Sequence, residues 1–229
     1  MRVFVAGATG ATGQVFVPMA EAAGHTLTLH VRPASRAGSP LGDDPRAAVF
    51  DLADEQATEA ALRGHDAIVS FVGTMRARFA RGDDYASSDL GSARQLARGA
   101  RRAGVPRMLL LSSVGAGGLG AYLKMKLACE EAVRAEGIGC TFFRPSILVS
   151  PEWAASGSHG ARRAPLGTTA LLGGLGHLPG LSGFSLDYKP IPLERVCAGF
   201  LDALAKPAEY DGRVVLGRDL WRLDVAPRA

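Results

Sequence analysis

Cysteine is scarce in this sequence, and its placement argues against two kinds of protein. Among the 229 residues there are three cysteines, Cys129, Cys140 and Cys197, which lie far apart and form no Cys-x-x-Cys pair. This spacing disfavours a disulfide framework and a zinc site, and it indicates reduced thiols. The five histidines form no His-x-His or His-x-x-x-His pair, so we expect no metal site.

Long apolar runs and a strong charge of either sign are also lacking. No apolar run is long enough to span a bilayer, so we expect no membrane segment. A strand pattern begins at Arg2 without a cleavage site behind it, which predicts a cytoplasmic protein without a signal peptide. The net charge is +4, and no aromatic residues alternate with the arginine clusters, which disfavours a nucleic-acid partner. Exposed helix faces leave both a monomer and an oligomer open.

What is present is a glycine pattern at the start of the chain. The short apolar run Val3–Ala6 is followed by Gly7, Gly10 and Gly13, and then by a helical pattern over Gln14–Ala23. Strand, glycine turn and helix form the arrangement with which doubly wound α/β folds bind a dinucleotide. Glycine lets the pyrophosphate approach the backbone, and the first N–H groups of the helix face the phosphates. The alternative is that these glycines serve packing alone.

Strand and helix patterns alternate along the chain in the way that βαβ crossovers require. This predicts one Rossmann-like α/β domain over residues 1–229, with a doubly wound parallel sheet. The predicted strands are Arg2–Ala6, Thr26–Val31, Ala47–Phe50, Asp66–Phe71, Arg107–Ser113, Cys140–Arg144 and Arg213–Leu216. The predicted helices are Gln14–Ala23, one that starts near Asp54, Tyr85–Ala103, Ala121–Glu136 and Pro192–Ala205.

The composition changes after Arg144. Residues 150–190 are rich in Gly, Pro, Ser and Leu and show little periodicity. A segment of this length is seldom idle in a compact domain. We therefore expect an irregular flap with short helices, which forms a small substrate-side region near the carboxyl end of the chain.

The second predicted strand ends where a dinucleotide's ribose is usually recognised. An acidic residue at this point is typical of NAD sites, but here Arg32 stands in that place with Arg36 nearby. A guanidinium binds a 2′-phosphate that a carboxylate would repel, so the sequence favours NADP over NAD. Asp51, with Leu52 after it, either contacts the adenine or caps the helix near Asp54.

Two further strand ends contribute candidate residues. Gly73 follows the fourth strand and would let a ribose or nicotinamide approach the backbone. Ser112 and Ser113 end the fifth strand, and Tyr122 opens the next helix with Lys126 one turn later on the same face.

This combination suits the reduction of a carbonyl group. Hydride reaches the carbonyl carbon while a proton must reach the oxygen, and a free phenol with a pKa of about 10 is a poor proton donor–acceptor at neutral pH. A neighbouring ammonium stabilises the phenolate, and a serine hydroxyl holds the carbonyl in place. The alternative is a surface tyrosine that merely pairs with Lys126.

Four segments together resemble the atypical short-chain dehydrogenases/reductases, small NAD(P)H-binding proteins related to the NmrA-like group. They are Gly7–Gly13, the Leu-Ser-Ser-Val-Gly-Ala segment 111–116, Tyr122-x-x-x-Lys126 and Arg144-Pro-Ser146. The resemblance extends from Arg2 to about Leu220. It implies a Rossmann fold in which Ser113, rather than Ser112, is the family serine. It also implies NADP(H) contacts from Gly7, Thr9, Gly10, Ala11, Thr12, Arg32, Asp51, Leu52, Phe71, Gly73 and Pro145.

The sequence departs from that family at one position of the reaction machinery. It contains no asparagine, although many relatives use one in a proton relay, and Asp89 or a water could take that place. We therefore expect an NADP-dependent oxidoreductase acting on a small carbonyl or alcohol through Ser113, Tyr122 and Lys126. The alternative is a non-catalytic NADP(H)-binding redox sensor, regulatory or assembly protein. A sugar-nucleotide epimerase is not expected, because its larger substrate domain has no room in this chain.

Overall fold

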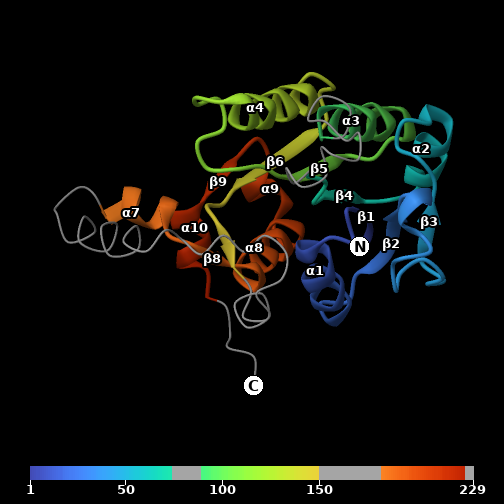
Figure 1. Cartoon of the computed structure of the whole chain (residues 1–229), viewed down its shortest axis with the longest axis horizontal. Helices are drawn as coiled ribbons and strands as arrows, with labels where there is room; N and C mark the ends of the chain where they lie inside the picture. The colour runs from blue at the N-terminus through green and yellow to red at the C-terminus, as the bar shows by residue number, and fades with distance from the viewer. Residues whose placement is uncertain (74–88, 150–181, 225–229) are drawn as a thin grey trace.

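The computed structural model describes residues 1–73, 89–149 and 182–224. Within them, seven parallel strands form one sheet in the order β3-β2-β1-β4-β5-β6-β9 (Figure 1). Their bounds are Arg2–Ala6 for β1, Thr26–Val31 for β2, Ala47–Val49 for β3, Ala67–Ser70 for β4, Arg107–Leu111 for β5, Gly139–Arg144 for β6 and Val214–Leu216 for β9. The chain runs outward from β1 to β3 and then returns to place β4 beside β1. The predicted doubly wound fold is thus confirmed, with its switch point between β1 and β4.

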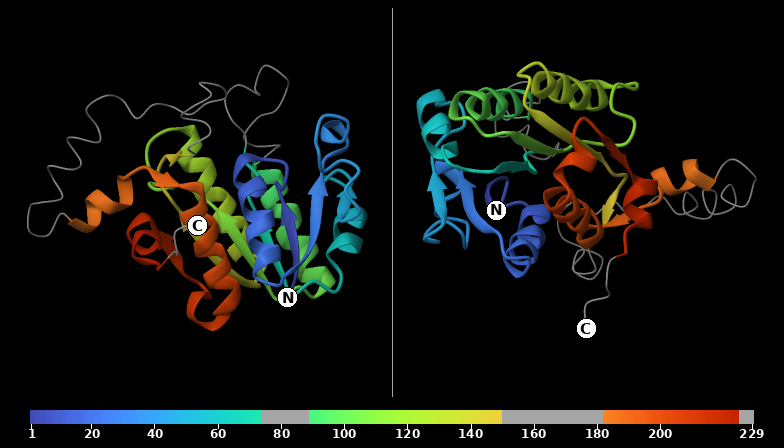
Figure 2. Two further views of the ribbon diagram at one scale, coloured as in Figure 1. Left: turned by 90° about the horizontal axis from the view of Figure 1, so that it is seen from below. Right: turned by 180° about the vertical axis from the view of Figure 1, so that it is seen from behind.

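Helices cover both faces of the sheet (Figure 1). One face carries α1 (Ala11–Ala22) and α8 (Leu193–Ala205), and the other carries α2 (Glu55–Leu62), α3 (Gly91–Ala103) and α4 (Ala121–Arg134). Four shorter elements are η1 (Pro33–Ser35), α7 (Ser182–Tyr188), α9 (Pro207–Tyr210) and α10 (Gly217–Arg222). Figure 2 shows that α7 lies beyond α10, at the end of the molecule opposite β3.

The strands bury both of their faces, as near-continuous apolar runs in a parallel sheet predict. On the side of α1 and α8 the core contains Phe16, Phe143 and Phe200, and the last two rings stack with centroids 3.9 Å apart. On the opposite side Phe4 and Phe142 pack with residues of α3 and α4. Sheet and helices therefore form a three-layer core that holds the carboxyl ends of the strands at one edge.

Two predicted boundaries near this edge differ from the structure by two residues or more. Helix α1 begins at Ala11 rather than Gln14, because the N–H of Gln14 already donates to the carbonyl of Gly10 at 2.9 Å. Strand β5 ends at Leu111 rather than Ser113, so both serines lie on the loop beyond the sheet.

The flap region has one feature that the sequence did not indicate. Strand β7 (Leu148–Val149) pairs in parallel with β8 (Ile191–Pro192), which joins the two ends of the segment. Residues 150–181 of the predicted flap lie outside the described residues, as do residues 85–88 at the start of the predicted helix Tyr85–Ala103. The described remainder of the flap contains α7.

Candidate active site

The glycine loop between β1 and α1 is shaped by close backbone contacts. Gly7 has a φ of +83°, and a Cβ there would lie 2.8 Å from the carbonyl carbon of Phe71 at the end of β4. A Cβ on Gly13 would lie 2.4 Å from the carbonyl oxygen of Gly7. Gly7 and Gly13 are therefore required by the fold itself, whereas Gly10 is exposed and has an ordinary φ of −80°.

Helix α1 leaves its amino end open to an anion. Its N-cap is Gly10, which provides no side-chain cap, and its first turn contains no acidic residue. The first N–H groups of a helix have no partner within the helix and carry its positive dipole end. Thr9 and Ala11 are half-buried at this point, and Thr12 is buried, so Thr12 would contribute its backbone. The loop therefore fits a diphosphate group.

The residues predicted at the adenosine end differ in exposure. Arg32 is half-buried directly after β2, where it precedes η1. Asp51 is exposed and accepts a hydrogen bond from the N–H of Ala53 at 2.9 Å. The suggestion that Asp51 caps the next helix is wrong, because Asp54 is the N-cap of α2 and accepts from the N–H of Ala57 at 3.0 Å.

Two side chains among the predicted cofactor residues belong to the core. Leu52 is buried in the apolar cluster under α2 and α3. The ring of Phe71 is buried between Phe16 and Phe200, with centroid separations of 5.1 and 4.9 Å. Only the backbone of Phe71 therefore stands at the crevice, and the Leu52 side chain is held in the core.

Lys126 is a buried charge at the end of β4. Its ammonium lies 3.5 Å from Oδ2 of Asp89, and the two side chains are 7% and 1% exposed. A Cβ on Gly73 would lie 3.6 Å from Nζ of Lys126 and 3.8 Å from Oδ2 of Asp89. The bare backbone of Gly73 thus stands directly in front of this ion pair.

Tyr122 lies at the edge of the same group. It is 37% exposed at the start of α4, and its ring centroid is 5.7 Å from Nζ of Lys126. The loop after β5 is tied to this helix start, because the N–H of Gly117 donates to the carbonyl of Leu123 at 2.8 Å. Helix α4 therefore brings the tyrosine and the lysine beside the loop that carries the serines.

The two serines have different environments. Ser112 is buried, and its hydroxyl donates to Oε1 of Glu130 at 2.6 Å. Ser113 is half-buried, and the N–H of the next residue, Val114, donates to the carbonyl of Pro145 at 2.9 Å. Ser113 and Pro145 therefore lie on adjoining loops at the same edge, while Ser112 belongs to a structural hydrogen bond.

Glu130 is the residue that the sequence analysis missed. Its carboxylate is fully buried and accepts two hydrogen bonds from the guanidinium of Arg144, at 2.8 and 2.7 Å. It links α4 to the ends of β5 and β6. A signal was available, because Glu130 follows Lys126 and Tyr122 at the same four-residue interval on one helix face.

The cysteines and other possible metal ligands form no metal site within the part of the chain that the structure describes. All three cysteines are buried with free thiols, and burial raises the pKa of Cys129 to about 11. Across the described ranges, no group of three or more His, Cys, Asp or Glu side chains could hold a metal ion. No helix in the same ranges is long and apolar enough to cross a membrane.

The sequence matches the NAD(P)H-binding family over residues 7–169, which is most of the chain and includes the glycine loop, Gly73, Tyr122 and Lys126. The chain belongs to this NAD(P)H-binding family. The prediction of an NAD(P)H-binding protein is thereby confirmed at the level of the family. None of the curated proteins matches the sequence significantly.

Solved structures agree with this fold. A short-chain dehydrogenase/reductase superfamily protein from Agrobacterium tumefaciens with bound NAD is 20% identical, with a TM-score of 0.69 over 95% of this chain and 77% of that one. A Rossmann-fold NAD(P)-binding protein from Shigella flexneri is 16% identical, with a TM-score of 0.61 over 92% and 89% of the two chains. The dTDP-glucose 4,6-dehydratase of Streptomyces venezuelae, with NAD bound, is 22% identical, with a TM-score of 0.64 over 93% and 74%.

Proposed function

We propose that this protein is an NADP-dependent oxidoreductase that transfers hydride between the nicotinamide and a small carbonyl or alcohol substrate. The observation that carries the proposal is the buried Lys126 ammonium, which stands behind Gly73 and one helical turn from Tyr122. Burying a charge is costly unless the protein pairs it, so an ammonium at the crevice edge of the sheet indicates a role there. The chain would act as a single domain, with the flap over residues 150–190 supplying substrate contacts.

Each member of the group would have a separate task. When bound, the nicotinamide supplies or accepts the hydride. Tyr122 would donate a proton to the carbonyl oxygen during reduction and accept it during oxidation. The positive charge of Lys126 near the ring would stabilise the phenolate that remains, and the same ammonium would donate to the cofactor ribose. The hydroxyl of Ser113 would donate a hydrogen bond to the substrate oxygen.

Asp89 would take the place of the asparagine that this sequence lacks. Its carboxylate lies 3.5 Å from Nζ of Lys126, where it would position the ammonium. The pair therefore keeps the lysine at the crevice edge when no cofactor is bound.

The preference for NADP rests on Arg32. The residue follows β2 at the position where NAD-specific sites usually have a carboxylate. The adjoining loop would place the adenine near Asp51, and the amino end of α1 would hold the diphosphate with the backbone of Gly10, Ala11 and Thr12.

The experiment measures NADPH consumption by the purified chain against a panel of aldehydes, ketones and quinones, with a nucleotide sugar as a further arm. We expect turnover on one of the carbonyl classes. Tyr122→Phe should lower that rate by about 10²–10⁴-fold and leave NADPH binding unchanged, because only the proton donor is lost. Tyr210→Phe is the matched control, since its hydroxyl donates to Asp202 at 2.5 Å on α8, away from the crevice.

Other outcomes point elsewhere. NADPH binding without turnover on any compound would favour the redox-sensor alternative, for which the missing asparagine is the supporting feature. NADPH consumption with the nucleotide sugar alone would indicate a reductase of nucleotide sugars rather than of small carbonyl compounds. Full activity of Tyr122→Phe would remove the proposed role of Tyr122.

A further inference from the structure

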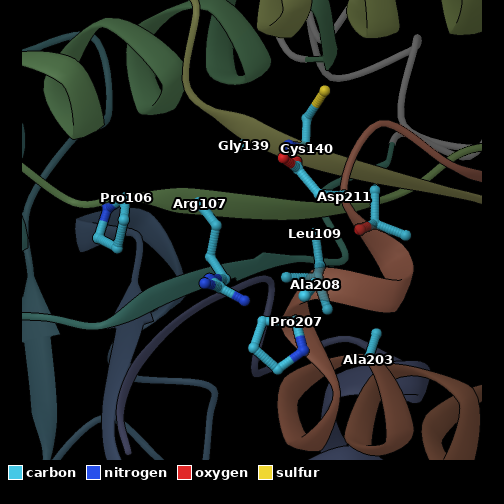
Figure 3. A pocket seen from close by; sticks show the side chains of 10 residues that line it. Pro106, Arg107, Leu109, Gly139, Cys140, Ala203, Pro207, Ala208 and Asp211 are labelled. Atoms are coloured by element: carbon cyan, nitrogen blue, oxygen red, sulfur yellow. Dashed lines mark hydrogen bonds between the residues drawn. The ribbon is translucent and has the colours of Figure 1, made fainter.

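A pocket lies at the edge of the sheet opposite the candidate cofactor site. It has a volume of about 270 Å³ and lies between the amino ends of β5 and β6 and the α8–α9 turn (Figure 3). Leu109 is the lining residue of β5 nearest to the crevice, and Ser112 follows three residues later, so about 10 Å of chain separates the pocket from the crevice at about 3.3 Å per residue. A ligand in this pocket would not overlap the nicotinamide nucleotide.

Arg107 is the feature that calls for a ligand. Its side chain extends from β5 toward Pro207 in the pocket (Figure 3). Arg107 as a whole is half-buried, and no carboxylate in the described part of the chain forms an ion pair with it. Its Nε is too buried for a ligand to reach, so the terminal Nη groups are the donors that an acceptor in the pocket would meet.

The rest of the lining indicates the class of ligand. Pro106, Leu109, Ala203, Pro207 and Ala208 give the pocket apolar walls. A guanidinium binds a carboxylate through two parallel hydrogen bonds, and such walls would hold a small apolar body attached to it.

Asp211 limits the charge that the pocket accepts. It lines the pocket, and its Oδ1 accepts from the N–H of Cys140 at 3.0 Å. A carboxylate in this position repels anions, and the repulsion increases with ligand charge. A singly charged ligand is therefore favoured over phosphate or a dicarboxylate.

The pocket is held in shape by hydrogen bonds between the α9 turn and β6. The hydroxyl of Thr141 donates to the carbonyl of Tyr210 at 2.8 Å, and the N–H of Gly212 donates to the carbonyl of Cys140 at 2.8 Å. A preformed site of this kind spends little free energy on ordering when it binds. We propose that this pocket binds a small monocarboxylate, with the carboxylate on Arg107 and the apolar part against the two prolines and α8.

The test uses benzoate as the probe and the uncharged benzamide as its isostere. Calorimetric titration of the whole protein at constant ionic strength should give saturable one-to-one binding of benzoate and at least tenfold weaker binding of benzamide. Arg107→Gln should weaken benzoate binding at least tenfold. Asp211→Asn, which keeps an oxygen for the N–H of Cys140, should strengthen it about threefold or more.

Two controls separate this site from the cofactor site. Arg101→Gln makes the same change of charge on α3, where the Arg101 side chain is 67% exposed, and should leave benzoate binding unchanged. NADPH binding should be equal in wild type, Arg107→Gln and Asp211→Asn, which shows that the variants are folded. The proposal is overturned if benzoate does not bind saturably, if Arg107→Gln binds it as well as wild type, or if NADPH competes with it.

Discussion

The ammonium of Lys126 is the charge on which the crevice depends most. It is almost fully buried, and Asp89 is the carboxylate that lies within ion-pair distance of it among the described residues. Both groups lose much hydration when they are buried. The ion pair is therefore not expected to stabilise the fold more than two apolar side chains in the same place would.

Removing one partner of this pair should therefore destabilise the fold strongly. We expect Asp89→Asn to lower the free energy of unfolding by about 3–5 kcal/mol, because it leaves a buried ammonium without its counter-charge. Lys126→Met in the same chain should recover part of the loss. Urea unfolding of the two single variants and the double variant measures the coupling.

An exposed pair provides the comparison. Arg102 and Glu55 approach to 2.8 Å but are 51% and 46% exposed. The same cycle on this pair should give a coupling of about 1 kcal/mol or less. Equal coupling in both cycles would mean that burial does not strengthen the dependence of Lys126 on Asp89.

Arg32 is the residue on which cofactor choice is expected to depend. We predict that Arg32→Gln raises the Kd for NADPH by about 10–100-fold, which is the loss of one or two charge-assisted hydrogen bonds. The Kd for NADH should change by less than about threefold, since NADH lacks the 2′-phosphate. Fluorescence titration with both nucleotides measures this.

Arg36→Gln is the matched control for that titration. Arg36 already pairs with Asp43 at 3.2 Å on the neighbouring loop, so its loss should affect NADPH binding less. A larger effect for Arg36 than for Arg32 would move the 2′-phosphate site to the loop after η1.

At the scale of elements, the three glycines of the β1–α1 turn have different roles, two in packing and one at the proposed ligand site. Gly7 and Gly13 allow the turn to pack against β4 and against itself. Gly10 stands at the exposed amino end of α1, where a Cβ would lie 3.3 Å from the carbonyl oxygen of Gly7. Packing and ligand binding can therefore be separated by substitution.

We predict opposite outcomes for two alanine variants of this turn. Gly10→Ala should change the melting temperature little and weaken NADPH binding at least tenfold, because the methyl group stands where the diphosphate approaches. Gly13→Ala should destabilise the fold by about 1–3 kcal/mol, because its Cβ would overlap the Gly7 carbonyl. Thermal unfolding and NADPH titration of both variants test this. Gly10→Ala binding NADPH like wild type would argue against a diphosphate at this turn.

Helix α4 is the element that assembles the candidate site. Tyr122, Lys126 and Glu130 lie at successive four-residue steps, so they share one face. Tyr122 is at the crevice, Lys126 is below Gly73, and Glu130 binds Ser112 and Arg144 deeper in the protein. One helix thus carries both the proposed catalytic groups and the contact that fixes its position against β5 and β6.

At the scale of the whole molecule, stability should depend on pH through two buried histidines. His30 lies at hydrogen-bond distance from the carbonyl of Phe50, 2.9 Å, and His65 lies 2.8 Å from the hydroxyl of Thr28. Loss of hydration on burial is the main cause that lowers the pKa of each below the usual 6.5. Both are therefore neutral in the folded protein at neutral pH.

The sign of the effect follows from proton uptake. The unfolded chain binds protons at these histidines near pH 6.5, before the folded chain does, so stability is complete above pH 6.5 and falls as the pH is lowered through the folded values. The slope is at most about 1.4 kcal/mol per pH unit for each histidine. Carboxylates in ion pairs affect stability at lower pH. Arg46 lowers the pKa of Asp44 to about 2, so the stability that this pair contributes is lost only as the pH falls below the unfolded value of 3.8.

Urea unfolding between pH 7.5 and pH 5 measures this dependence. His30→Gln keeps a donor for the Phe50 carbonyl and removes one titrating group, so its slope should be lower than that of the wild type. A slope remains because burial also lowers the pKa of His65 and of His25. An unchanged slope would assign the dependence to other groups.

Local sequence determined much of this protein. Apolar runs buried on both faces and regular helix–strand alternation require a parallel sheet, and the spacing of the three glycines requires a tight turn into a helix. The interval between Tyr122 and Lys126 places both on one helix face in any α-helix. These features depend on residues close together in the chain, so they could be predicted without the fold.

Only the tertiary structure decided what depends on residues far apart in the chain. It paired Ser112 with Glu130 and left Ser113 at the crevice, and it placed Asp89 beside Lys126. It held the Leu52 side chain and the ring of Phe71 in the core, and it left Arg107 facing a pocket. The physical reason is that burial and charge pairing depend on which elements pack together, and no local pattern specifies the neighbour across a sheet.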